Sequence, residues 1–256
     1  MSYAGLSPEE IQARMDERYA SNTAYPLVLP WDMARMEELA EVTLRLLGDV
    51  RGLEVLDIAC GTGGLAAQMA AAGVASHVGI DLSAEAIRQA RDGHEQFSTV
   101  RFEVMDAQSL TFANHSFDCV IAREAIEHLP DARQAFSEIM RVLRPGGRLV
   151  LTSPNRDSLH LHMARALGQP EFLCSMDHIR ELTFTECCTL LQEASFIITE
   201  TAGVFLMPYW GIHGVDGPVR TLTDTDAETI ALFRDLGRRV GPDYAFCYVI
   251  RAEKPV

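Results

Sequence analysis

Basic residues are scarce in this chain. The sequence has 22 lysines and arginines against 36 aspartates and glutamates, which gives a formal net charge of −14 at pH 7. Proteins that bind a nucleic-acid backbone usually present a basic field that releases counterions from the phosphates. The charge therefore argues against a nucleic-acid partner and favours a small-molecule ligand.

Paired cysteines and long apolar runs are also missing. No Cys-x-x-Cys spacing occurs among the six cysteines, which lie among apolar neighbours: Cys60, Cys119, Cys174, Cys187, Cys188 and Cys247. We expect reduced thiols, without disulfides or a zinc site. No stretch approaches the roughly 18 apolar residues of a membrane span, and the N-terminus has no basic-then-apolar leader pattern. These absences predict a soluble protein of the cytoplasm that does not act at a membrane.

The length of 256 residues and the 48% hydrophobic content predict a single domain over 1–256, with a small lid or without one. Ser7 is placed to cap a helix that runs to about Tyr19. A loop with Tyr25, Pro26, Pro30 and Trp31 then leads to a second amphipathic helix, Met33 to Leu47. Residues 1–48 are either packing helices or a lid over a ligand, and both interpretations stay open.

Strand and helix patterns alternate after this region. Strands are predicted at 53–58, 77–81, 100–105, 117–122 and 148–153, with helices at 65–72, 84–92 and 132–143. Such alternation predicts an α/β fold with a doubly wound, mostly parallel sheet, whose ligands lie at the carboxyl ends of the strands. Further on, the patterns predict a helix at 183–194, a strand at 196–204, a helix at 224–240 and a strand at 244–252. The last two strands can form an antiparallel edge, which completes a Rossmann-like sheet of seven strands.

A glycine-rich turn follows the first strand. Val55 to Gly64 reads Val-Leu-Asp-Ile-Ala-Cys-Gly-Thr-Gly-Gly, which carries Asp57 to the strand end and allows the backbone to approach a ligand at Gly61 and Gly63. Asp81 follows Gly61 by 20 residues, where a dinucleotide-binding unit has its ribose acid. A nucleotide cofactor and an ordinary strand-turn-helix unit both fit these two segments.

Five segments taken in order resemble the class I S-adenosylmethionine-dependent methyltransferases. They are the glycine-rich turn, then Gly79-Ile80-Asp81-Leu82-Ser83, Val104-Met105-Asp106-Ala107, Phe117 to Ala122, and Arg141 to Leu149 with its Arg-Pro-Gly-Gly turn. The resemblance covers residues 50 to 155. It departs from the family at Ala59, where a glycine is frequent and where alanine restricts φ and leaves less room.

The resemblance implies S-adenosylmethionine as the cofactor, and the residue chemistry agrees. Asp57, Gly61 and Gly63 suit the methionine end, and Asp81 can accept both ribose hydroxyls. Asp106 can accept the adenine amino group while the Ala107 N–H faces a ring nitrogen. The expected cofactor-binding residues are Asp57, Ala59, Gly61, Gly63, Asp81, Leu82, Asp106, Ala107 and Ala122.

Two carboxylates and an imidazole follow the fourth strand. Glu124, Glu127 and His128 are spaced to lie on one side of a helical turn, and such a cluster invites Mg²⁺ or another divalent cation. Together with Ser153-Pro154-Asn155 and the Asp177 to Thr183 segment, it resembles ubiquinone-biosynthesis O-methyltransferases and small-RNA 3′-terminal 2′-O-methyltransferases. The resemblance implies that Glu124, Glu127, His128 and His178 hold a metal.

Several functions remain open at this point. The first is metal-assisted O-methylation of a small molecule, with His128, Glu127 and Arg123 as the catalytic candidates. The alternatives are metal-free N- or C-methylation with His128 as base, RNA 2′-O-methylation, and a cofactor-binding protein without chemistry. Arg123 either meets an acidic substrate group or pairs with Glu127.

The region 204–240 is expected to shape the acceptor pocket. Its aromatic loop, residues 205–213, is typical of a pocket wall. A homodimer contact and simple core packing are equally consistent with it.

Overall fold

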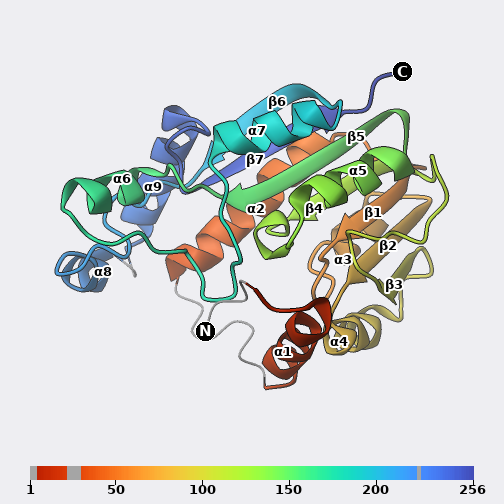
Figure 1. Cartoon of the computed structure of the whole chain (residues 1–256), viewed down its shortest axis with the longest axis horizontal. Coiled ribbons are helices and arrows are strands. Elements are labelled where there is room, and N and C mark those ends of the chain that lie inside the picture. Colours follow the sequence, from red (N-terminus) through yellow and green to blue (C-terminus); the bar gives the residue numbers. More distant parts are fainter. Residues whose placement is uncertain (1–4, 22–29, 224–225) are drawn as a thin grey trace.

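We describe residues 5–21, 30–223 and 226–256 of a computed structural model of the chain. Seven strands form one sheet in the order β3-β2-β1-β4-β5-β7-β6 (Figure 1). The strands are β1 (Glu54–Ile58), β2 (Ser76–Asp81), β3 (Val100–Val104), β4 (Phe117–Arg123), β5 (Leu143–Pro154), β6 (Ile197–Val204) and β7 (Cys247–Glu253). The strands from β1 to β5 pair in parallel, and β7 runs antiparallel to both β5 and β6. The predicted antiparallel pairing of the last two strands is confirmed, with β6 at the edge.

Helices cover both faces of the sheet (Figure 1). They are α1 (Pro8–Ala20), α2 (Pro30–Leu47), α3 (Ala66–Ala71), α4 (Ala84–His94), α5 (Ala132–Val142), α6 (Leu159–Ala166), α7 (Phe184–Glu193), α8 (Asp216–Thr223) and α9 (Ala227–Val240). Alternate residues of β4 enter different cores: Val120 packs with the α5 and α7 side, and Ile121 with the α2 and α3 side. This period of two follows from the strand geometry and buries both faces of the sheet.

The two N-terminal helices occupy different places. Helix α1 begins with a capping box between Ser7 and Glu10 and packs against α4. Helix α2 packs against β5, β6 and β7, and Leu39 and Leu46 on its inner face are fully buried. The predicted aromatic residue Tyr25 of the connecting loop, with its neighbour Pro26, lies outside the described residues.

The C-terminal part differs from the sequence prediction in its helices. The helix predicted over 224–240 starts only at Ala227, because the side chain of Asp226 accepts hydrogen bonds from the N–H groups of Glu228 and Thr229 and caps it. Residue 224 lies outside the described part of the chain. Helices α6 and α8 were not predicted, since each is only eight residues long.

The cysteines and the helix lengths bear on two further expectations from the sequence. All six cysteines are free thiols. Among the described residues, none of the helices has the length and apolar character needed to cross a bilayer.

Candidate functional site

The glycine-rich turn is tied to the end of β2 by Asp81. One Asp81 carboxylate oxygen accepts from the Gly61 N–H and the other from the Ser83 N–H, each at 2.9 Å. Burial raises the pKa of Asp81, and the backbone hydrogen bonds oppose this rise. A carboxylate can accept about four hydrogen bonds, so Asp81 keeps capacity for a diol.

Ala59 confirms that the departure from glycine has a conformational cost. Its φ is 53°, in the left-handed region that alanine rarely adopts. Such a backbone costs a non-glycine residue about 1 kcal/mol. The turn forms nevertheless, because the Cys60 N–H donates to the Ile80 carbonyl at 2.9 Å and fixes the chain beside β2.

Asp57 is buried beside the turn and is 4% exposed. Burial raises its pKa to about 7, an effect that the charge of Arg123 opposes and that of Asp81 increases. Its Oδ2 lies 3.8 Å from Nε2 of His77, which is fully buried.

Two cavities meet at these strand ends. The smaller, of about 50 Å³, is lined by Leu82, Asp106, Ala107 and Ala125 among others. Asp106 accepts a hydrogen bond from the Gln108 N–H at 2.8 Å. One carboxylate oxygen of Asp106 therefore stabilises the turn that follows β3. The larger cavity, of about 480 Å³, runs from Asp57, Ala59 and Gly61 past the residues that follow β4.

Two of the expected cofactor residues do not line these cavities. Gly63 faces Phe102, since a Cβ there would lie 2.8 Å from the Phe102 ring. Ala122 is 1% exposed and packs in the core. Both residues therefore support the turn and the sheet.

Glu124 corrects the sequence prediction of one helical face. Its φ is 50°, its N–H donates to the Thr152 carbonyl, and the following single 3₁₀ turn spans Ile126–His128. The expected helical spacing from Glu124 to His128 is wrong, because Glu124 stays bonded to β5. Its carboxylate instead accepts from Arg35 Nη1 at 2.9 Å and from Thr152 Oγ1 at 3.1 Å.

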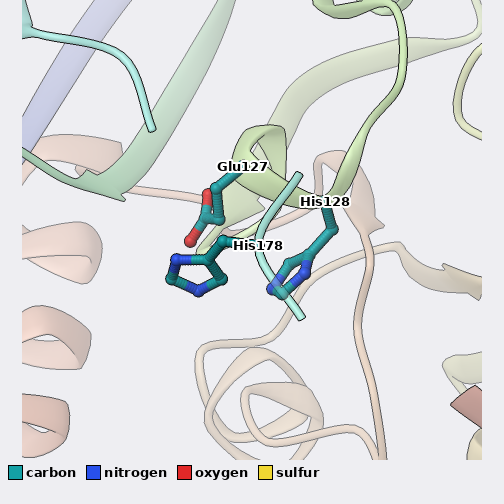
Figure 2. A group of neighbouring side chains, drawn as sticks. All are labelled: Glu127, His128 and His178. Carbon is teal, nitrogen blue, oxygen red and sulfur yellow. The ribbon is translucent and has the colours of Figure 1, made fainter. Parts of the chain in front are cut away.

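Glu127, His128 and His178 come together, as Figure 2 shows. Each offers one ligand atom, and these atoms lie within 4.8 Å of one another. Glu127 is 1% exposed; its Oε2 accepts from Ser153 Oγ at 3.2 Å, while Oε1 has no hydrogen-bond partner among the described residues. Burial raises the pKa of Glu127 to about 8, with a further contribution from the charge of Glu124.

Each of the two histidines is held by a hydrogen bond at its Nδ1 atom. His128 Nδ1 lies 3.2 Å from the Asp177 carbonyl oxygen, and His178 Nδ1 lies 2.6 Å from Glu181 Oε1. Both partners are acceptors, so each Nδ1 carries a proton, and in the neutral form of each ring the Nε2 keeps its lone pair. Their rings meet edge to face with centroids 4.9 Å apart.

The histidines differ in charge preference. Burial lowers the pKa of His128 to about 3, and the charges of His178 and Arg18 act in the same direction. Burial also opposes the charged form of His178, but the Glu181 hydrogen bond and the charge of Glu127 outweigh it and raise the pKa of His178.

Helix α1 reaches both parts of the site. Asp16 accepts from Ser83 Oγ at 2.6 Å and from the Glu85 N–H at 3.0 Å, directly after Asp81. Arg18 forms an ion pair with Asp177, whose carbonyl holds His128.

Sequence reasoning missed several supporting residues. Asp177 and Glu181 lie inside the segment that suggested His178, and a search for partners of its ring could have found them. Arg35 had no sequence signal, because its contact with Glu124 joins residues 89 positions apart.

The far end of the larger cavity has aromatic walls. Trp31, Trp210 and Phe246 line it, and the Phe246 ring meets Trp31 at 6.2 Å and Trp210 at 5.4 Å between centroids. Phe205 and Tyr209 of the 205–213 loop are buried in the core beneath them.

Comparisons with known proteins agree with this geometry. A family model described as "Methyltransferase domain" matches residues 56–151. An O-methyltransferase of Pyrenophora dematioidea is 37% identical over 192 residues, which cover 69% of this chain and 68% of that protein. The ubiquinone biosynthesis O-methyltransferase of Aeromonas salmonicida is 31% identical over 170 residues, 63% of this chain and 70% of that protein. Further relatives are matched over 26 to 59% of their own length.

A solved structure shares the fold. The S-adenosylmethionine-dependent methyltransferase of Mesorhizobium loti is 19% identical and superposes with a TM-score of 0.59 over 86% of this chain and 97% of that chain. The chain belongs to the class I S-adenosylmethionine-dependent methyltransferases and is an enzyme of that family.

Proposed function

We propose that the enzyme methylates a hydroxyl oxygen of a small molecule, and that Glu127, His128 and His178 hold a divalent cation beside the acceptor. The observation that carries this proposal is the convergence of three donor atoms within 4.8 Å, from two separate segments of the chain. Both relatives described above have O-methyltransferase in their names, which supports oxygen as the acceptor atom.

The cluster has the chemistry of a metal site. Metal-binding histidines usually donate their second ring N–H to a carbonyl or carboxylate, which fixes the tautomer and the ring orientation. His128 and His178 both do so through Nδ1. The buried Oε1 of Glu127, which no described residue meets with a hydrogen bond, supplies an oxygen that can bind a cation. When bound, a divalent cation lowers the pKa of a coordinated hydroxyl and makes it a better nucleophile.

Glu124 has a different role from the one that the resemblance implied. Its two oxygens already accept from Arg35 and Thr152, and it lies outside the group of three. We assign Glu124 to anchoring helix α2 at the edge of the cavity, where Trp31 and Asp32 of its first turn line the wall.

His128 suits the role of ligand better than that of a free general base. A general base works best with a pKa near the working pH, and burial holds the pKa of His128 near 3. Such an imidazole stays neutral, which is the form that binds metals.

The acceptor is proposed to be a planar or largely apolar molecule. The cavity of about 480 Å³, which takes in the expected donor residues as well, falls in the usual range for small-molecule sites. Trp31, Trp210 and Phe246 give it flat apolar walls, while the net charge of −14 argues against a polyanionic substrate. The free thiols of the six cysteines support a reducing location such as the cytoplasm.

The test is turnover of a panel of catechols and vicinal diols with S-adenosylmethionine, with methylated products located by mass spectrometry. EDTA treatment should lower turnover roughly a hundredfold, and Mg²⁺, Mn²⁺ or Zn²⁺ should restore it. The variants Glu127→Gln and His178→Asn should lose turnover and the response to metal. Glu95→Gln, at an exposed position after α4, is the matched control. Full turnover in EDTA would refute the metal, and products methylated only on nitrogen or carbon would refute the oxygen acceptor.

A further inference from the structure

Four arginines line the large cavity, and three of them have an acidic partner. Arg18 pairs with Asp177, Arg220 with Asp216, and Arg35 with both Asp32 and Glu124. Arg123 differs, because within the described part of the chain it forms no hydrogen bond and no ion pair. The ion pair between Arg123 and Glu127 that the sequence left open is therefore not formed.

Arg123 lies against the glycine-rich turn. It is the last residue of β4, and its Nη2 is 3.0 Å from the place that a Cβ on Gly64 would occupy. Gly64, which also lines the cavity, therefore leaves space for the Arg123 guanidinium. The charge of Arg123 also acts on Asp57 at the end of β1.

This position is the methionine end of the donor site. Parallel strands place their ligand at the carboxyl ends, and β1 and β4 are neighbours at the centre of the sheet. S-adenosylmethionine brings an ammonium and a carboxylate to this place. Asp57 can attract the ammonium, and an arginine without an acid of its own can accept the carboxylate through two parallel hydrogen bonds.

We infer that Arg123 binds the carboxylate of the methionine moiety of S-adenosylmethionine and thereby selects the donor by its amino-acid end. The inference concerns donor binding alone, so it holds for any acceptor atom and with or without a metal. The alternative partner of Arg123 is an acidic group on the acceptor, and ligands with and without the methionine carboxylate distinguish these two anions.

The matched ligands are S-adenosylmethionine and decarboxylated S-adenosylmethionine, which differ in that carboxylate. Calorimetry should show that Arg123→Gln weakens binding of S-adenosylmethionine by about 10- to 100-fold, the range of a charge-assisted hydrogen bond. Binding of the decarboxylated compound should change by less than about twofold. Arg123→Lys, which keeps the charge without the planar fork, should lose a smaller factor for S-adenosylmethionine only.

Arg101→Gln is the control, because Arg101 lies on β3 outside both cavities. Binding of the decarboxylated compound also reports whether each variant folds. An equal loss for both ligands in the Gln and Lys variants would mean a structural role and would overturn the inference. Unchanged binding of S-adenosylmethionine would assign Arg123 to another anion, such as one on the acceptor, and would overturn it as well.

Discussion

Gly237 of α9 packs directly on the backbone at the end of β6, and replacing it with alanine should destabilise the protein. A Cβ at this position would lie 2.3 Å from the Phe205 nitrogen, 2.5 Å from its carbonyl carbon and 2.6 Å from its Cα. Ordinary van der Waals contact begins at 3.4 Å, so the helix and the strand must separate by about 1 Å. No rotamer change can relieve the contact, because all three atoms are backbone.

Two effects of opposite sign set the magnitude for Gly237→Ala. Alanine favours the helix by about 1 kcal/mol over glycine. Overpacking of a rigid interior costs about 3 kcal/mol when the backbone must shift. We therefore expect the free energy of unfolding to fall by about 2 kcal/mol. The Phe205 carbonyl accepts from the Phe246 N–H at 2.7 Å, so the shift should also reach a cavity wall and raise the KM of the acceptor.

Urea unfolding followed by circular dichroism measures this loss. Gly93→Ala is the matched control, because Gly93 also lies in a helix, α4, and a Cβ there would meet nothing within 4 Å. That control should gain about 0.5 to 1 kcal/mol. If Gly237→Ala were as stable as the wild type, or if both variants shifted alike, the close approach of α9 to β6 would be refuted.

Three further predictions concern pH and the donor site. His160 is 1% exposed and its pKa is lowered to about 3 by burial, so its stabilising neutral state is complete above pH 6.5 and is lost as the pH falls toward 3. Between pH 8 and pH 5 the free energy of unfolding of the wild type should fall by about 2 kcal/mol more than that of His160→Phe. The control His162→Gln, at an exposed position, should behave as the wild type. Parallel pH curves for the wild type and His160→Phe would contradict this prediction. Asp81→Asn leaves only one acceptor oxygen for the N–H groups of Gly61 and Ser83, so calorimetry should show S-adenosylhomocysteine binding about 100-fold more weakly, and a loss under threefold would disprove the role. Asp16→Ala removes two hydrogen bonds that dock α1, and we expect the same Kd to rise about tenfold; an unchanged Kd would show that α1 does not close the donor site.

The sequence predicted the parallel part of the sheet, and seven of the nine residues expected to bind the cofactor line the two cavities at the strand ends. Strand periodicity, the turn after Ile58 and the acid at the end of β2 are local features, and the chain geometry brings neighbouring strand ends together without further information. Helices α1 and α7 are local features of the same kind, since each begins with a capping box, at Ser7 and at Thr183.

The sequence prediction failed where contacts between distant segments override local spacing. Glu124 was expected on a helix, but its backbone N–H pairs with β5 and its side chain meets Arg35 of α2. Neither partner is near in sequence, and a spacing rule for helices cannot anticipate that the chain after β4 stays hydrogen-bonded to β5.

The sequence by itself indicated the methyl donor, because the five segments that resemble the methyltransferase family are short stretches whose order and local geometry are fixed along the chain. Only the tertiary structure decided how the acceptor side is built. It joined Glu127 and His128 to His178 and left Glu124 outside. It also placed Arg123 beside Gly64, where none of the described residues forms an ion pair with it. The physical reason is that a metal-type cluster or a paired charge depends on distances of a few ångströms between side chains that are far apart along the chain.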